Sequence, residues 1–99
     1  MTQSTVRVVA RLVARPETIE DLKLTLHELV TATRQEAGCV SYELLHNAQD
    51  PTDFVFVEEW TSDKALDEHL SSAHMQAASV KAGALLSAPP DIRRYRLLY

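Results

Sequence analysis

Residues 54–60, FVFVEEW, alternate between two kinds of side chain. In an extended strand Phe54, Phe56, Glu58 and Trp60 lie on one face, because successive side chains point to opposite sides. Three large aromatic side chains predict that this face is covered by helices. The Glu58 carboxyl is therefore expected to point into the core, and the chain must supply a layer that covers it.

Three other segments also have the composition of strands. Residues 5–14 (TVRVVARLVA) alternate well, residues 39–46 (CVSYELLH) follow a glycine, and DIRRYRLLY is predicted to extend to the final residue. The segment NAQDPTD at 47–53 is rich in turn residues and is expected to join two of these strands in a hairpin.

Helical periodicity fills the two gaps between strands. A long helix is predicted from Pro16, with TIED at 18–21 resembling a capping box, and apolar residues continue at helical spacing to Ala37. Gly38 is expected to end it in the left-handed conformation. Ser62 suits the N-cap of a short helix over 63–70, and a further helix is expected from Ala73 to Leu86.

The predicted order is β-α-β-β-α-β, with the second helix in two pieces. Short connections of this kind predict an α+β, ferredoxin-like fold, in which a four-stranded antiparallel sheet carries its helices on one face. Ninety-nine residues predict a single domain, 1–99. The other face should carry Val9, Val13, Val55 and Val57, which is too apolar for a solvated surface, so a homodimer formed through this face is expected.

Composition restricts the partners and the location. Ten Lys and Arg against fourteen Asp and Glu give a formal charge of -4, which argues against nucleic acid or an anionic membrane as the main partner. The N-terminus does not resemble a signal peptide and no stretch is long enough to span a membrane, so a cytoplasmic protein is expected. One cysteine, Cys39, excludes an intramolecular disulfide and a thiolate zinc site within one chain.

Polar groups are predicted to converge near Trp60. The helix over 63–70 has an apolar stripe that contains Leu66 and His69, so the imidazole should point towards the same interior as Glu58 and Trp60. Tyr42 is expected to join them from the neighbouring strand. A carboxyl and an imidazole in an apolar wall can both move protons, and burial should raise the pKa of Glu58. From spacing alone, a buried histidine with satisfied hydrogen bonds and an ion-paired Glu58 are the more common arrangement.

The sequence contains no pattern typical of a metal site or a phosphate-binding loop. The four histidines contain no pair at i, i+4, so no metal site is predicted, and two glycines provide no phosphate-binding loop. No cofactor is expected. Met75, at the start of the last helix, is expected in the pocket wall or the core.

The chain resembles the antibiotic biosynthesis monooxygenase family, which includes quinol monooxygenases. GCVSYEL, then FVFVEEW-S--ALDEHL-S-HMQA, carries the resemblance, which covers nearly the whole chain. It implies a dimeric α/β barrel and oxygenation without flavin, metal or haem. The substrate, an electron-rich aromatic such as a quinol or anthrone, is deprotonated, and its anion reacts directly with molecular oxygen.

By position, the resemblance assigns His69, Trp60 and Glu58 to catalysis, with His69 as the proton-transfer or orienting group and Trp60 as a pocket wall and indole donor. Phe56 stands where the polyketide oxygenases of the family carry a polar residue. The residues expected to contact substrate are Tyr42, Phe56, Leu66, His74 and Met75.

Three alternatives follow from the same resemblance. Haem-degrading relatives use an Asn, a Trp and a His, which fall here on Ala10, His69 and Ser79, so haem degradation is rejected. A relative that isomerises a phosphorylated sugar shares His69 and His74, and would need an anion site at the helix start near His74. A dimeric small-molecule binding or stress protein without turnover would have the same fold.

Overall fold

A computed structural model describes residues 5–99. The elements follow the predicted order, with the second helix divided. They are β1 (Val6–Val13), the 3₁₀ turn η1 (Pro16–Thr18), α1 (Ile19–Thr33), β2 (Cys39–His46), β3 (Asp53–Trp60), α2 (Asp63–Leu70), α3 (Ala73–Gly83) and β4 (Asp91–Tyr95).

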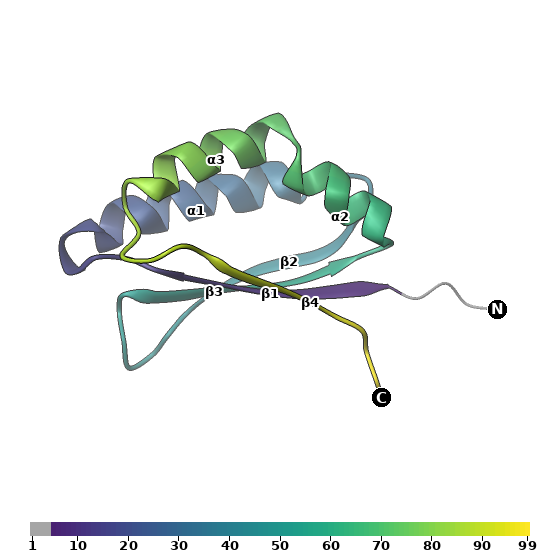
Figure 1. The fold of residues 1–99 in the computed structure, drawn as a ribbon, viewed down its shortest axis with the longest axis horizontal. Helices are drawn as coiled ribbons and strands as arrows, with labels where there is room; N and C mark the ends of the chain where they lie inside the picture. Colours follow the sequence, from purple (N-terminus) through teal and green to yellow (C-terminus); the bar gives the residue numbers. More distant parts are fainter. Residues whose placement is uncertain (1–4) are drawn as a thin grey trace.

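The four strands form one antiparallel sheet in the order β2-β3-β1-β4. In β3, Glu58 lies opposite Val8 of β1 and Tyr42 of β2, so both neighbouring strands fix its position. Figure 1 shows α1 and α3 side by side over one face of this sheet, with α2 at one end. This is the ferredoxin-like arrangement, and the predicted α+β fold is confirmed.

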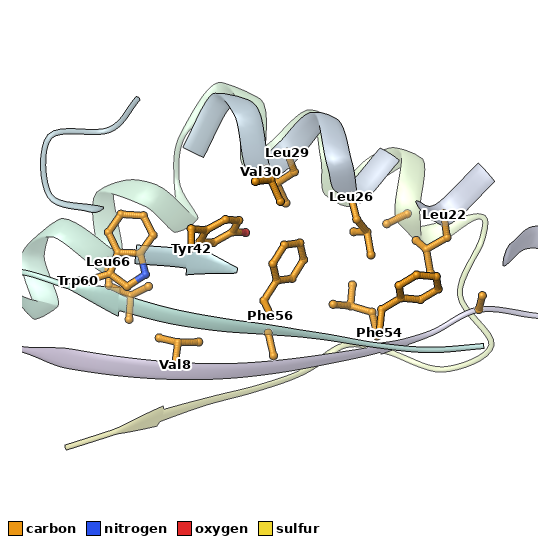
Figure 2. Close-up of a cluster of buried hydrophobic side chains, with 14 of the residues drawn as sticks. Val8, Leu22, Leu26, Leu29, Val30, Tyr42, Phe54, Phe56, Trp60 and Leu66 are labelled. Carbon is orange, nitrogen blue, oxygen red and sulfur yellow. The ribbon is translucent and has the colours of Figure 1, made fainter. Parts of the chain in front are cut away.

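The core lies between the sheet and the helices. Figure 2 shows Phe54 and Phe56 rising from the sheet towards Leu22 and Leu26 of α1, while Trp60 lies at the other end of the row. The predicted faces are confirmed, since every helix-facing residue of β1 and β3 is buried. These residues are Val6, Val8, Ala10, Leu12, Phe54, Phe56, Glu58 and Trp60.

Two features at the ends of α1 differ from the prediction. Thr18 forms no side-chain cap, because its hydroxyl lies 2.6 Å from the Leu85 carbonyl oxygen and donates to it instead. The helix ends at Thr33, and Gly38 does not adopt a positive φ. Gly38 is needed for space, since a Cβ there would overlap the Cβ of Ala65 in α2. The turn between α1 and β2 can therefore press directly against α2.

Two elements are shorter than predicted. Helix α3 ends at Gly83 because the residues after it bond to the end of β1, with Ser87 N donating to Val13 O over 2.8 Å. Strand β4 ends at Tyr95, where its pairing with Arg7 of β1 ends, so residues 96–99 are not part of a strand. The remaining boundaries agree closely, and Ser62 caps α2 as predicted, accepting a hydrogen bond from Ala65 N.

The uncovered face of the sheet is partly apolar. Val9 and Val57 lie opposite each other on β1 and β3, and each is 38% exposed. The ion pair of Arg7 with Glu59, at 3.5 Å, borders them. A homodimer through this face stays a prediction. Among residues 5–99, no helix is both long and apolar enough to cross a membrane.

Replacing Gly38 by Ala should destabilise the protein by about 1–3 kcal/mol, the usual cost of forcing a methyl group into a filled space. Gly83→Ala is the matched control, because a Cβ at Gly83 meets no atom within 4 Å and alanine favours a helix. Urea denaturation of both variants checks this. Equal stability of Gly38→Ala and wild type would show that the contact with Ala65 does not constrain the turn.

The dimer hypothesis is tested by Val57→Glu, which places a charge at the centre of the proposed interface. A stable interface of this kind should bury at least about 2,000 Å² in total, and a buried unpaired carboxylate should dissociate it. Val80→Glu introduces the same charge on α3, where the side chain is 79% exposed, and should leave the assembly unchanged. Sedimentation velocity distinguishes the outcomes. A monomeric wild-type protein at micromolar concentration would refute the hypothesis.

Candidate active site

A cavity of about 260 Å³ lies between the helix-facing side of the sheet and the helices. Its walls are mainly apolar, and α1, α2, α3 and all four strands contribute to them. Two titratable side chains besides Tyr42, those of Glu58 and His69, are part of the wall. An apolar cavity with a few convergent polar groups is the usual form of a small-molecule site.

Glu58 is a buried carboxyl with one hydrogen bond. Its Oε1 accepts from the indole Nε1 of Trp60 over 2.8 Å, two residues along the same face of β3. Burial raises the pKa of Glu58 to about 7, because the charged form loses its hydration, and the Trp60 hydrogen bond only partly opposes this. Glu58 can therefore both take up and release a proton near neutral pH.

His69 enters the cavity wall from the end of α2. Its ring centroid lies 4.6 Å from that of Trp60 and 5.6 Å from that of Tyr42, and the residue is 1% exposed. Burial lowers the pKa of His69, although the hydrogen bond that its Nδ1 donates to Glu36 acts in the opposite direction. The neutral imidazole is consequently favoured at neutral pH, which is the form that accepts a proton.

Glu36 forms a network that the sequence did not predict. Its Oε2 lies 2.7 Å from Nδ1 of His69 and 2.7 Å from Nε2 of His74. The three residues come from the turn after α1, the end of α2 and the start of α3, so their spacing in the sequence follows neither helical nor strand periodicity. The only available signal was a carboxylate two residues before Gly38, which is a weak one.

These three side chains are also the one group of potential metal ligands found among residues 5–99, with ligand atoms all within 4.8 Å. The fit to a metal is poor. Ligand atoms about 2.1 Å from a tetrahedral zinc ion lie about 3.4 Å from each other, whereas Oε2 lies 2.7 Å from both nitrogens. That distance is typical of hydrogen bonds.

The structure brings most of the predicted site residues together. Tyr42, Phe56, Leu66 and Met75 line the cavity with Glu58 and His69. Trp60 does not line it, because the indole is completely buried behind Glu58 and donates its N–H to that carboxyl rather than to a ligand. His74 also lies outside the cavity wall, because its ring is turned to Glu36.

Comparisons with known proteins identify the family of this chain. Residues 5–81 match the family model described as antibiotic biosynthesis monooxygenase. The chain belongs to this family. It is 40% identical over 86 residues to "Putative monooxygenase Rv0793" of Mycobacterium tuberculosis, an alignment covering 87% of this chain and 84% of the relative. It is 34% identical to "Putative monooxygenase YcnE" of Bacillus subtilis, in an alignment that covers 84% of this chain and 87% of the relative.

Solved structures show the same similarity. The crystal structure of PA3566 from Pseudomonas aeruginosa superposes with a TM-score of 0.92 at 30% identity, over 100% of this chain and 99% of that chain. The family resemblance drawn from the sequence is thus confirmed. Family membership and the names of these relatives support a monooxygenase-type function on a small-molecule substrate.

Glu58 gives a prediction about stability and pH. Its folded-state pKa of about 7 lies above the ordinary 4.5, so the native state binds the proton more tightly, and stability should fall as pH rises from 4.5 to 7. The loss is on the order of 2–3 kcal/mol. Glu58→Gln keeps an acceptor for Trp60 but cannot ionise, so it should be more stable than wild type at pH 8 and comparable at pH 4.5.

Urea denaturation at both pH values measures this difference. Glu59→Gln, on the opposite face of β3, controls for the removal of a carboxylate from this strand. Parallel pH dependences of unfolding in wild type and Glu58→Gln would contradict the raised pKa.

Proposed function

We propose that this protein is a cofactor-independent monooxygenase acting on an electron-rich aromatic substrate such as a quinol or anthrone. One observation carries the proposal: the wall of an apolar cavity contains both an imidazole of lowered pKa, His69, and a carboxyl of raised pKa, Glu58. Family membership supports oxygenation.

The reaction needs only groups that the cavity provides. A hydroxyl of the substrate transfers its proton to His69, and the resulting anion is electron-rich enough to reduce molecular oxygen directly. The apolar lining of the cavity favours aromatic rings. Glu58, when protonated, can supply a proton to the peroxide formed on the substrate.

Atoms and electrons balance without another reductant. A quinol plus O₂ gives a hydroxyquinone plus water: one oxygen atom enters a ring C–O bond, and the other leaves as water with two hydrogens from the substrate. The substrate thus supplies the electrons that break the O–O bond. The substrate O–H proton taken by His69 is returned when this water forms, and Glu58 regains its proton from the C–H bond of the oxygenated ring carbon, which breaks as the O–O bond is cleaved.

The size of the cavity favours one substrate class over the other. A cavity of about 150 Å³ suffices for benzene, so about 260 Å³ suits one or two rings. A three-ring anthrone would need the walls to move apart. A quinol of one or two rings is therefore the preferred substrate class.

The isomerase alternative receives less support. The walls formed by residues of the described chain include no Lys or Arg to bind a phosphate, and Glu58 would repel a phosphate when it is ionised. His74, expected near an anion site, is bonded to Glu36 instead. A non-catalytic binding protein remains the second hypothesis, because an apolar cavity alone would serve it equally.

Oxygen uptake with one- and two-ring quinols tests the proposal, using protein dialysed against EDTA and subtracting the rate without protein. With ¹⁸O₂, one labelled atom should appear in the product and one in water. His69→Gln can still donate to Glu36 but is a far weaker base, so turnover should fall by about a hundredfold or more. Leu22→Ala is the control for lost stability, since Leu22 is buried outside the cavity wall.

Uptake no faster than the protein-free rate, together with saturable quinol binding, would favour the non-catalytic hypothesis. Turnover by His69→Gln equal to that of wild type would remove His69 from the mechanism. Loss of turnover after EDTA dialysis, restored by a metal ion, would refute cofactor independence.

A further inference from the structure

The Glu36 carboxylate lies at the junction of three elements. It belongs to the turn between α1 and β2, which Gly38 allows to press against Ala65 of α2. Backbone hydrogen bonds hold the turn, since Glu36 N donates to Thr33 O and Cys39 N donates to Glu36 O. The side chain is partly buried and its Oε2 contacts both His69 and His74 at 2.7 Å.

A carboxylate can only accept hydrogen bonds, so each facing ring nitrogen must carry a proton. Nδ1 of His69 is therefore the protonated nitrogen of the neutral ring, and Nε2 has an unshared electron pair. Nε2 has no hydrogen-bond partner within residues 5–99, while Glu36 lies outside the cavity wall that His69 helps to form. Nε2 is thus the nitrogen available to a molecule in the cavity.

We propose that Glu36 is the positioning residue of this site: it holds His69 in the Nδ1–H tautomer, presents Nε2 as the base, and balances the charge of the imidazolium that forms. This inference rests on the proposed function. In the step itself, the substrate O–H bond breaks and an Nε2–H bond forms. The Nδ1 proton stays on His69, hydrogen-bonded to Glu36.

His74 completes the arrangement. Its Nε2 occupies a second acceptor direction of the same oxygen, which restricts rotation of the Glu36 carboxylate. The titratable groups that act on His69 are Glu36 and His74, and Glu58 is part of the same cavity wall. The negative charge of Glu36 also favours the protonated form of Glu58. The Glu36 carboxylate therefore favours both the form of His69 that accepts a proton at Nε2 and the form of Glu58 that donates one.

Glu36→Gln tests the assignment with nearly the same shape. Without the charge, the tautomer of His69 is no longer fixed and the imidazolium loses its counter-ion. We expect kcat to fall by about 10²–10⁴-fold, with KM changed by less than about threefold; a carboxylate-to-amide change beside a catalytic histidine has costs of this scale. Glu28→Gln is the matched control, because Glu28 pairs with Lys81 on the exposed side of α1.

A second readout does not depend on turnover. In ¹⁵N-histidine NMR spectra, His69 of the wild type should be the Nδ1–H tautomer, and Glu36→Gln should shift it towards Nε2–H and lower its pKa. The Glu28→Gln spectrum should match wild type. If wild type turns over no quinol, the proposed function fails, while these spectra still decide whether Glu36 fixes the tautomer.

Three results would overturn the positioning role. One is a wild-type His69 with its proton on Nε2, a result that needs no variant to fold. Another is an unchanged His69 tautomer and pKa in Glu36→Gln. The third is a shifted tautomer with kcat within threefold of an active wild type, because the charge and tautomer would then not matter for catalysis.

Discussion

Strand β3 is hydrogen-bonded on both sides, and its side chains alternate between a covered and an uncovered face. Phe54, Phe56 and Trp60 require the helices to cover one face, and the same alternation forces Glu58 to be buried with them. A carboxyl in that place must either be neutral or have a donor. Glu58 has a donor in Trp60 and a raised pKa as well. The chemistry of the cavity follows from this one constraint on the strand.

Helix α2 and the turn after α1 determine the other half of the site. The α2 stripe buries His69 beside Trp60, where burial alone would favour a neutral imidazole of either tautomer. The turn approaches closely enough for Glu36 to select between them, and this approach depends on the missing side chain at Gly38. Gly38 lets Glu36, two residues earlier in the chain, approach His69 and thereby determines which nitrogen of that ring carries the proton. The packing of the turn against α2 and the acid–base chemistry of His69 therefore depend on the same contact.

The site uses two titratable groups whose pKa values move in opposite directions relative to their ordinary values. Burial disfavours the charged form of each, so the pKa of Glu58 is raised and that of His69 is lowered. The uncharged form of each side chain is therefore well populated near neutral pH, which suits an aromatic ligand in an apolar cavity. A phosphorylated ligand would meet no cationic side chain in the cavity wall formed by the described chain.

Local sequence determined the elements, their order and their faces, because strand alternation and helix capping by Ser62 depend on neighbouring residues only. It also placed Glu58, Trp60 and His69 in one interior, since each position follows from the period of its own element. Tertiary structure decided the rest. Thr18 bonds to Leu85, residues 84–87 join the end of β1, and Glu36 meets two histidines more than thirty residues away. No local period encodes such contacts, because they depend on how closely separate elements approach.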